Sequence, residues 1–172
     1  LGARGTSLGA PEDRPYGERS GFVKDPAGNQ WYIATRTEPH YLDQPPRSVT
    51  PHLYVENRPG REAATFIGFL QEAFGAEVAF RHDSPDGLVA HAVVRLQGGT
   101  IAIGEGRDPG FTAPAAFYLY VEDADALYAR AVRAGAKGTH APADQTYGDR
   151  MGTIEDPWGN EWFIATHTPR VG

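Results

Sequence analysis

The sequence contains no cysteine. Disulfide cross-links and thiolate metal sites are therefore excluded. It also lacks any apolar run approaching the roughly 18 residues that a membrane-spanning helix needs. The first residues contain no apolar stretch typical of a signal peptide. We therefore expect a cytoplasmic protein with no membrane partner.

Positive charge is also scarce. There are 16 Lys and Arg against 22 Asp and Glu, and the formal net charge is -6. Because nucleic-acid backbones are bound by clustered Lys and Arg, and no such cluster occurs, we expect no nucleic-acid partner. The chain does have 40% hydrophobic and 11% aromatic residues, enough for a folded core.

The main organisational feature is an internal repeat. Pro11–Thr37 and Pro142–Thr168 align without a gap at an offset of 131, and 15 of 27 positions are identical. Such self-similarity indicates a duplicated structural unit. Both copies contain Asp-Pro-x-Gly-Asn, in which Pro presets a turn and Gly tolerates a positive φ, so each predicts a hairpin turn.

The repeat suggests how the chain is organised. We expect residues 1–38 to be the C-terminal quarter of a preceding, truncated domain, and 49–170 to be a complete domain. Residues 39–48, with three prolines, have the composition of a linker.

Periodicity after the linker predicts the same order of elements twice, namely a strand, a helix and three strands. Apolar residues follow a helical stripe over Arg61–Phe74, which Gly75 closes, and Asp123 is a plausible cap for a second helix over Asp123–Ala134. The expected strands are Thr50–Val55, Val78–His82, Leu88–Leu96, Thr100–Ile103, Ala116–Val121 and a set ending in Trp162–Thr166.

Several segments of residues 49–168 resemble one known family. They are Thr50–Val55, Glu72–Glu77, His91–Arg95, Leu119–Asp123, Tyr147–Arg150, Asp156–Trp162 and Ala165–His167. The family is the vicinal-oxygen-chelate superfamily of glyoxalases, bleomycin-resistance proteins and extradiol dioxygenases, and the segments are most similar to its PhnB-like branch. The resemblance implies an α+β fold in which paired βαβββ modules form a curved eight-stranded sheet around a cleft. The N-terminal copy would add a β-hairpin.

Metal-dependent members of this family carry His or Glu ligands on inward-facing strand positions. The resemblance places those positions at Thr50, Ala102, Ala116 and Phe163, none of which is an ordinary ligand. A register shift of two residues gives His52, Gly104, Tyr118 and Glu161, which include only two ordinary ligands. Because a catalytic metal normally has three or more protein ligands, we expect no metal ion and no other cofactor.

Strand alternation predicts what lines the cleft instead. The expected ligand-binding residues are His52, Tyr54, His91, Tyr118, Tyr120, Arg150 and Phe163. Such a surface would suit a flat ligand. Alternatively, the tyrosines are core residues, the histidines are structural, and Asp149 and Arg150 form an ion pair or hairpin clamp. We assign no catalytic residue.

The function that these observations favour is metal-free binding or sequestration of a small, partly aromatic molecule, as in antibiotic-resistance members of the family. The alternatives are a glyoxalase-like isomerase, lyase or dioxygenase, with His52 or His91 as base or with a metal if the register is misread, and a structural or interaction module. We also expect the strand-like segment Phe22–Thr35 to dock on another sheet edge or a second chain, giving a homodimer or a swapped assembly.

Overall fold

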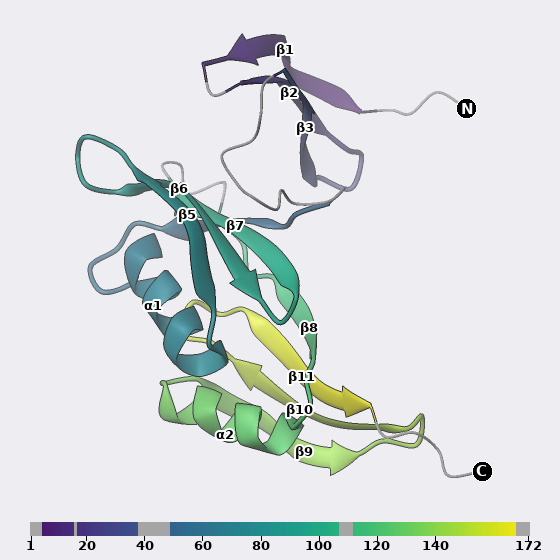
Figure 1. Cartoon of the computed structure of the whole chain (residues 1–172). Helices are drawn as coiled ribbons and strands as arrows, with labels where there is room; N and C mark the ends of the chain where they lie inside the picture. Colours follow the sequence, from purple (N-terminus) through teal and green to yellow (C-terminus); the bar gives the residue numbers. More distant parts are fainter. Residues whose placement is uncertain (1–4, 16, 38–48, 107–111, 168–172) are drawn as a thin grey trace. The chain divides into compact units, whose positions relative to one another are not determined.

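The computed structural model describes residues 5–15, 17–37, 49–106 and 112–167. The chain divides into two compact units, 1–45 and 46–172 (Figure 1). This division falls within the expected linker 39–48, which lies outside the described residues, so the assignment of domains stays a prediction. No helix in the described ranges is long and apolar enough to cross a membrane.

The N-terminal unit is a small antiparallel sheet with strand order β1-β2-β3. Its strands are β1 (Thr6–Arg14), β2 (Glu18–Lys24) and β3 (Gln30–Arg36). The expected hairpin corresponds to β2 and β3, which pair from Glu18 with Arg36 to Lys24 with Gln30. A third strand, β1, pairs with β2 in addition to the expected hairpin.

The second unit begins with a βαβββ module, which we call module 1. It contains β4 (His52–Glu56), α1 (Ala63–Phe74), β5 (Glu77–Asp83), β6 (Val89–Leu96) and β7 (Gly99–Gly106). The sheet order is β4-β7-β6-β5, with β4 parallel to β7 and the other pairs antiparallel.

Module 2 repeats this arrangement. It contains β8 (Ala116–Tyr120), α2 (Ala124–Arg133), β9 (Lys137–Asp144), β10 (Asp149–Glu155) and β11 (Glu161–His167). The order β8-β11-β10-β9, with β8 parallel to β11, is that of module 1. The expected α+β fold of paired βαβββ modules is therefore confirmed.

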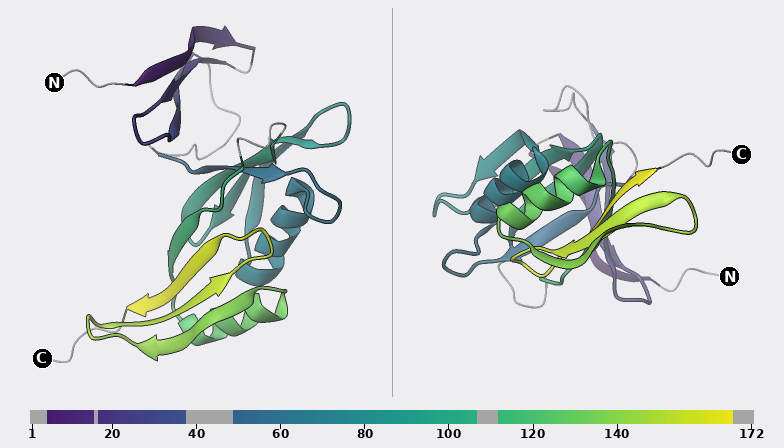
Figure 2. Two further views of the ribbon diagram at one scale, coloured as in Figure 1. Left: turned by 180° about the vertical axis from the view of Figure 1, so that it is seen from behind. Right: turned by 90° about the horizontal axis from the view of Figure 1, so that it is seen from below.

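The expected eight-stranded sheet is not continuous. The eight strands form two separate four-stranded sheets, because the edge strands β4 and β8 each pair within their own module among the described residues. The modules are joined through their helices instead, which lie side by side (Figures 1 and 2).

Local sequence explains both helices. The apolar stripe of α1 is buried, and Gly75 ends it at a φ of 69°, where its N–H bonds the Gln71 carbonyl. Helix α2 begins after Asp123, whose carboxylate accepts the Ala126 N–H at 2.9 Å. Both expected helices are therefore present.

The turn before β11 connects the two modules. The ring of Trp158 lies 5.0 Å from that of Phe66 on α1, and its Nε1 donates to the Arg61 carbonyl at 2.7 Å. Trp162 is fully buried, 4.7 Å from Phe74 at the end of α1. The main core thus lies on the helix side of both sheets, and alternate strand residues point to the opposite face.

Candidate functional site

The face of the module 2 sheet that is turned away from α2 carries aromatic and ionisable residues in cross-strand rows. Phe117, Leu119, Trp162 and Ile164 pack in the core with α2, so their neighbours point the other way. One row pairs Tyr118 with Phe163, which in turn pairs with Thr153. The next rows contain Tyr120, Ala165 and Met151, and then Asp149 with His167. We call this surface the β8–β11–β10 face.

Stacked rings form the centre of the face. The rings of Tyr118 and Phe163 are 5.5 Å apart and within 6° of parallel, and Tyr120 lies 5.2 Å from Tyr118. Tyr118 also donates its hydroxyl to Met151 Sδ at 3.0 Å. Tyr118 and Tyr120 are nevertheless 46% and 58% exposed. Aromatic surface is therefore open to a ligand, rather than enclosed as in the core alternative.

One end of the face holds a polar triad. Asp149, only 4% exposed, accepts the Tyr120 hydroxyl at 3.0 Å and His167 Nδ1–H at 2.9 Å. The hydrogen bond from His167 and then that from Tyr120 hold the pKa of the Asp149 carboxyl below its usual range. Bonding to Asp149 in turn raises the pKa of Tyr120. The carboxylate therefore orients a phenol and an imidazole, and Nε2 is the ring nitrogen of His167 that Asp149 does not bind.

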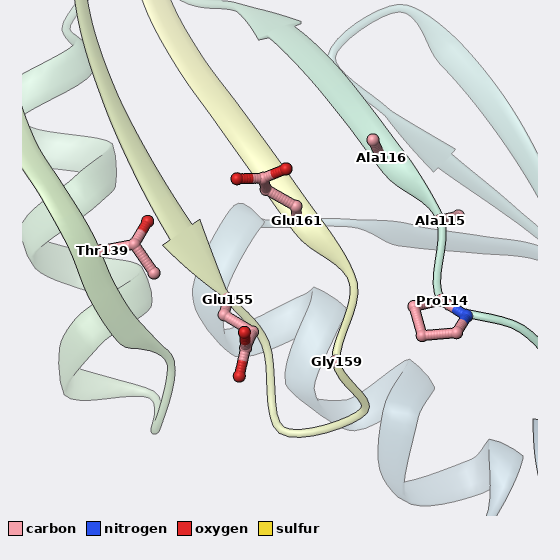
Figure 3. Close-up of a pocket in the computed structure, with 7 residues that line it drawn as sticks. All are labelled: Pro114, Ala115, Ala116, Thr139, Glu155, Gly159 and Glu161. Atoms are coloured by element: carbon pink, nitrogen blue, oxygen red, sulfur yellow. The ribbon is translucent and has the colours of Figure 1, made fainter.

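The other end of the face is a shallow pocket of about 350 Å³. Glu155 and Glu161, which pair across β10 and β11, supply two exposed carboxylates (Figure 3). The remaining lining comes from Pro114, Ala115, Ala116, Thr139 and Gly159. None of the seven expected ligand-binding residues lines this pocket. It is nonetheless continuous with the aromatic rows, because Ala116 and Glu161 are two residues before Tyr118 and Phe163 on the same strands.

Histidines occupy the corresponding face of module 1. His52 stacks on Tyr54 at 4.4 Å, and the His91 ring is 5.5 Å away. Although part of His52 is exposed, the crowded ring loses hydration, and this effect followed by repulsion from His91 lowers its pKa to about 4. Gly104 packs closely on the neighbouring strand, since a Cβ there would lie 3.0 Å from the Ala90 carbonyl oxygen, whereas its 3.5 Å distance to His52 Nε2 would be an ordinary contact.

Six of the seven expected site residues form two groups, one on each module, and Arg150 belongs to neither. His52, Tyr54 and His91 lie together, as do Tyr118, Tyr120 and Phe163. Arg150 lies on the α2 side of β10, where it donates to Asp125 at 2.8 Å and to Asp144 at 3.1 Å. This geometry makes Arg150 a clamp, as in the alternative interpretation of the sequence, although its partners are Asp125 and Asp144. Whether these residues bind a ligand remains a prediction.

The strand register also locates the positions at which metal-dependent members of the family carry their ligands. His52 pairs with Ala102, and Tyr54 with Gly104. In module 2, Tyr118 pairs with Phe163 and Ala116 with Glu161. Within the described ranges no three His, Asp or Glu side chains are grouped to hold a metal ion. The residues at these positions thus do not fit a metal with three protein ligands.

Comparison with known proteins now places the chain. The sequence profile of the Glyoxalase/Bleomycin resistance protein/Dioxygenase superfamily matches residues 57–164. The chain belongs to this superfamily. An uncharacterised protein of Mycobacterium bovis is 35% identical over 129 residues, which cover 69% of this chain and 82% of that protein.

Solved structures agree on the fold. TioX from Micromonospora sp. ML1 superposes with a TM-score of 0.58 at 19% identity, covering 73% of this chain and 99% of that one. A PhnB protein from Bacillus cereus gives 0.54 at 16% identity, covering 70% and 99%. The resemblance to the superfamily is confirmed, whereas membership of its PhnB-like branch is only loosely supported.

Sequence reasoning did not assign Asp149, Met151 and His167 to the β8–β11–β10 face. The signal was present. Counting back from the Asp-Pro-x-Gly-Asn turn pairs Glu155 with Glu161, and the same antiparallel register then pairs Asp149 with His167. The two carboxylates of the pocket follow from the same count.

Proposed function

We propose that this superfamily member binds a small, planar, partly aromatic molecule on the β8–β11–β10 face without a metal ion. The observation that carries the proposal is the near-parallel pair of rings of Tyr118 and Phe163, in a surface where Tyr118 and Tyr120 are exposed to solvent. The aromatic surface that Tyr118 and Tyr120 leave exposed favours a stacked aromatic ligand over a purely aliphatic one. Such binding is compatible with the sequestering role expected from the sequence.

Polar groups at the two ends of the face narrow the ligand class. Glu155 and Glu161 favour a cationic or amine-bearing end, since carboxylates attract positive charge. At the other end, Asp149 with Tyr120 and His167 offers hydrogen bonds to a hydroxyl or carbonyl. We therefore infer a flat ring system with a cationic end and a hydrogen-bonding end.

Two acridines of similar size test this proposal. Fluorescence titration with proflavine, a planar cation, should give saturable binding that is tighter than with acridine-9-carboxylate, a planar anion. Binding should raise the melting temperature, because a native-state ligand stabilises the fold. Glu155→Gln combined with Glu161→Gln should remove the preference for the cation.

A matched pair of variants makes the test specific. Phe163→Ala should weaken proflavine binding by about tenfold, the value of a lost aromatic contact. Tyr32→Ala changes the equivalent residue of the N-terminal copy and should have no effect. Equal affinity in both variants would reject the aromatic face as the binding surface.

A further inference from the structure

The two repeat copies are built alike around the Asp-Pro-x-Gly-Asn turn. Asp156 accepts the Asn160 N–H at 2.9 Å and Trp162 Nε1–H at 2.9 Å. Asp25 does the same with the Asn29 N–H at 2.9 Å and Trp31 Nε1–H at 3.0 Å. The turn aspartate therefore holds the start of the following strand, β11 or β3, by the same hydrogen bonds in both copies.

In module 2, β11 receives a strand and a helix. Side chains of β11 and its turn hold both ends of the incoming strand: Asn160 Oδ1 accepts the Ala115 N–H at 3.0 Å, and Thr166 Oγ1 accepts the Ala124 N–H at the start of α2 at 2.8 Å. Strand β8 pairs in parallel with β11. Together β8 and α2 cover Trp162 and Ile164, which are both 0% exposed.

The N-terminal sheet keeps the same receiving groups. Asn29 and Thr35 are the counterparts of Asn160 and Thr166, and Trp31 and Ile33 are those of Trp162 and Ile164. Here, however, Trp31 is 47% exposed and Ile33 is 61% exposed. Among the described residues β3 pairs with β2 alone, so no described strand occupies its outer edge. Contiguous apolar surface beside an open strand edge is typical of an interaction site.

We propose that this surface, the outer edge of β3 with Trp31 and Ile33, receives a strand–helix segment with the chemistry of residues 115–134. The incoming strand runs parallel to β3, and its first amide is received by Asn29. The following helix begins at Thr35 and covers Trp31 and Ile33 with small and aliphatic residues, the role that Ala124, Leu127 and Ala131 have on α2. This strand–helix segment is the expected occupant because the Asn, Trp, Ile and Thr that contact it in module 2 are identical in the N-terminal copy.

The test uses the full chain with a second copy of residues 113–134 fused ahead of residue 1 by a flexible linker. Because the fused segment is tethered, the test does not depend on the affinity of an isolated peptide. Hydrogen exchange of the Gln30–Arg36 amides is measured by mass spectrometry in the fused and unfused chains. Exchange should slow by about tenfold or more in the fusion.

Two controls decide the outcome. Ile33→Asp, a change at an exposed position, should return exchange in the fusion to the unfused rate, and so should an insert in which the counterparts of Leu119 and Leu127 are Asp. Equal slowing with the wild-type and the Asp-substituted insert would overturn the proposal, as would no slowing at all. If the unfused chain is already protected at Gln30–Arg36 and light scattering shows a dimer that Ile33→Asp abolishes, a second copy occupies the surface and the proposal is wrong.

Discussion

The two copies of the repeat differ far more in burial than in sequence. Trp162 and Trp31 follow the same turn and donate to the equivalent aspartate, yet one is fully buried and the other is 47% exposed. The local sequence is thus sufficient for the turn, the strand and the indole hydrogen bond. Burial requires a strand and a helix that come from elsewhere, and in module 2 these are β8 and α2.

Truncating the two tryptophans should give the largest difference between the copies. Trp162→Ala should lower the free energy of unfolding by about 3–5 kcal/mol, because a large buried side chain is replaced by a cavity beside Phe74 and Phe117. Trp31→Ala should cost less than about 1 kcal/mol, as is usual for exposed positions. Urea denaturation followed by circular dichroism measures both. Equal losses would mean that Trp31 is covered in solution.

The turn aspartates provide a second, smaller contrast. Asp156→Ala should lower the free energy of unfolding by about 3 kcal/mol, because the buried Asn160 amide and the indole of Trp162 lose their acceptor. Asp25→Ala removes the same bonds where water can replace them, so its effect on stability should be clearly smaller. The same denaturation experiment applies. A larger loss for Asp25→Ala would show that burial does not set the strength of these bonds.

A further contrast separates the two modules of the second unit. The sequence Leu-Tyr-Val-Glu occurs at 53–56 and at 119–122, so His52 and Tyr54 of module 1 occupy the positions of Tyr118 and Tyr120 in module 2. With a pKa of about 4, His52 binds its proton less readily in the folded than in the unfolded chain, whose reference value is 6.5. Its contribution to stability should therefore be complete above pH 6.5 and be lost as the pH falls from there towards 4.

Nuclear magnetic resonance titration of the histidine ring protons measures this effect directly. The His52 signal should move well below pH 6.5. The substitution His91→Gln should raise the His52 pKa only part of the way back, because loss of hydration is the larger cause of the shift. An ordinary titration of His52 near pH 6.5 would show that its ring is well hydrated. The close approach of His91 and the loss of hydration would then not determine the His52 pKa.

Much of this architecture could be anticipated from the residues alone. The apolar stripe and Gly75 predict α1, Asp123 predicts the start of α2, and the repeated turn predicts two hairpins. Alternation correctly placed Tyr118, Tyr120 and Phe163 on one surface. Strand register counted from the turn would have added Asp149 and His167. All of these depend on interactions between residues that are close in the chain or across one hairpin.

Long-range packing decided the remainder. The sequence groups Arg150 with the expected ligand-binding residues, whereas Asp125 on α2 and Asp144 on β9 hold its side chain on the helix side of β10, and its binding of a ligand stays a prediction. The two four-stranded sheets are held together by long-range contacts, in which α1 packs beside α2 and against Trp158 and Trp162. Trp162 and Ile164 are buried, whereas the identical residues Trp31 and Ile33 are exposed. The difference arises because burial requires a second element, such as α2, that comes from a distant part of the chain.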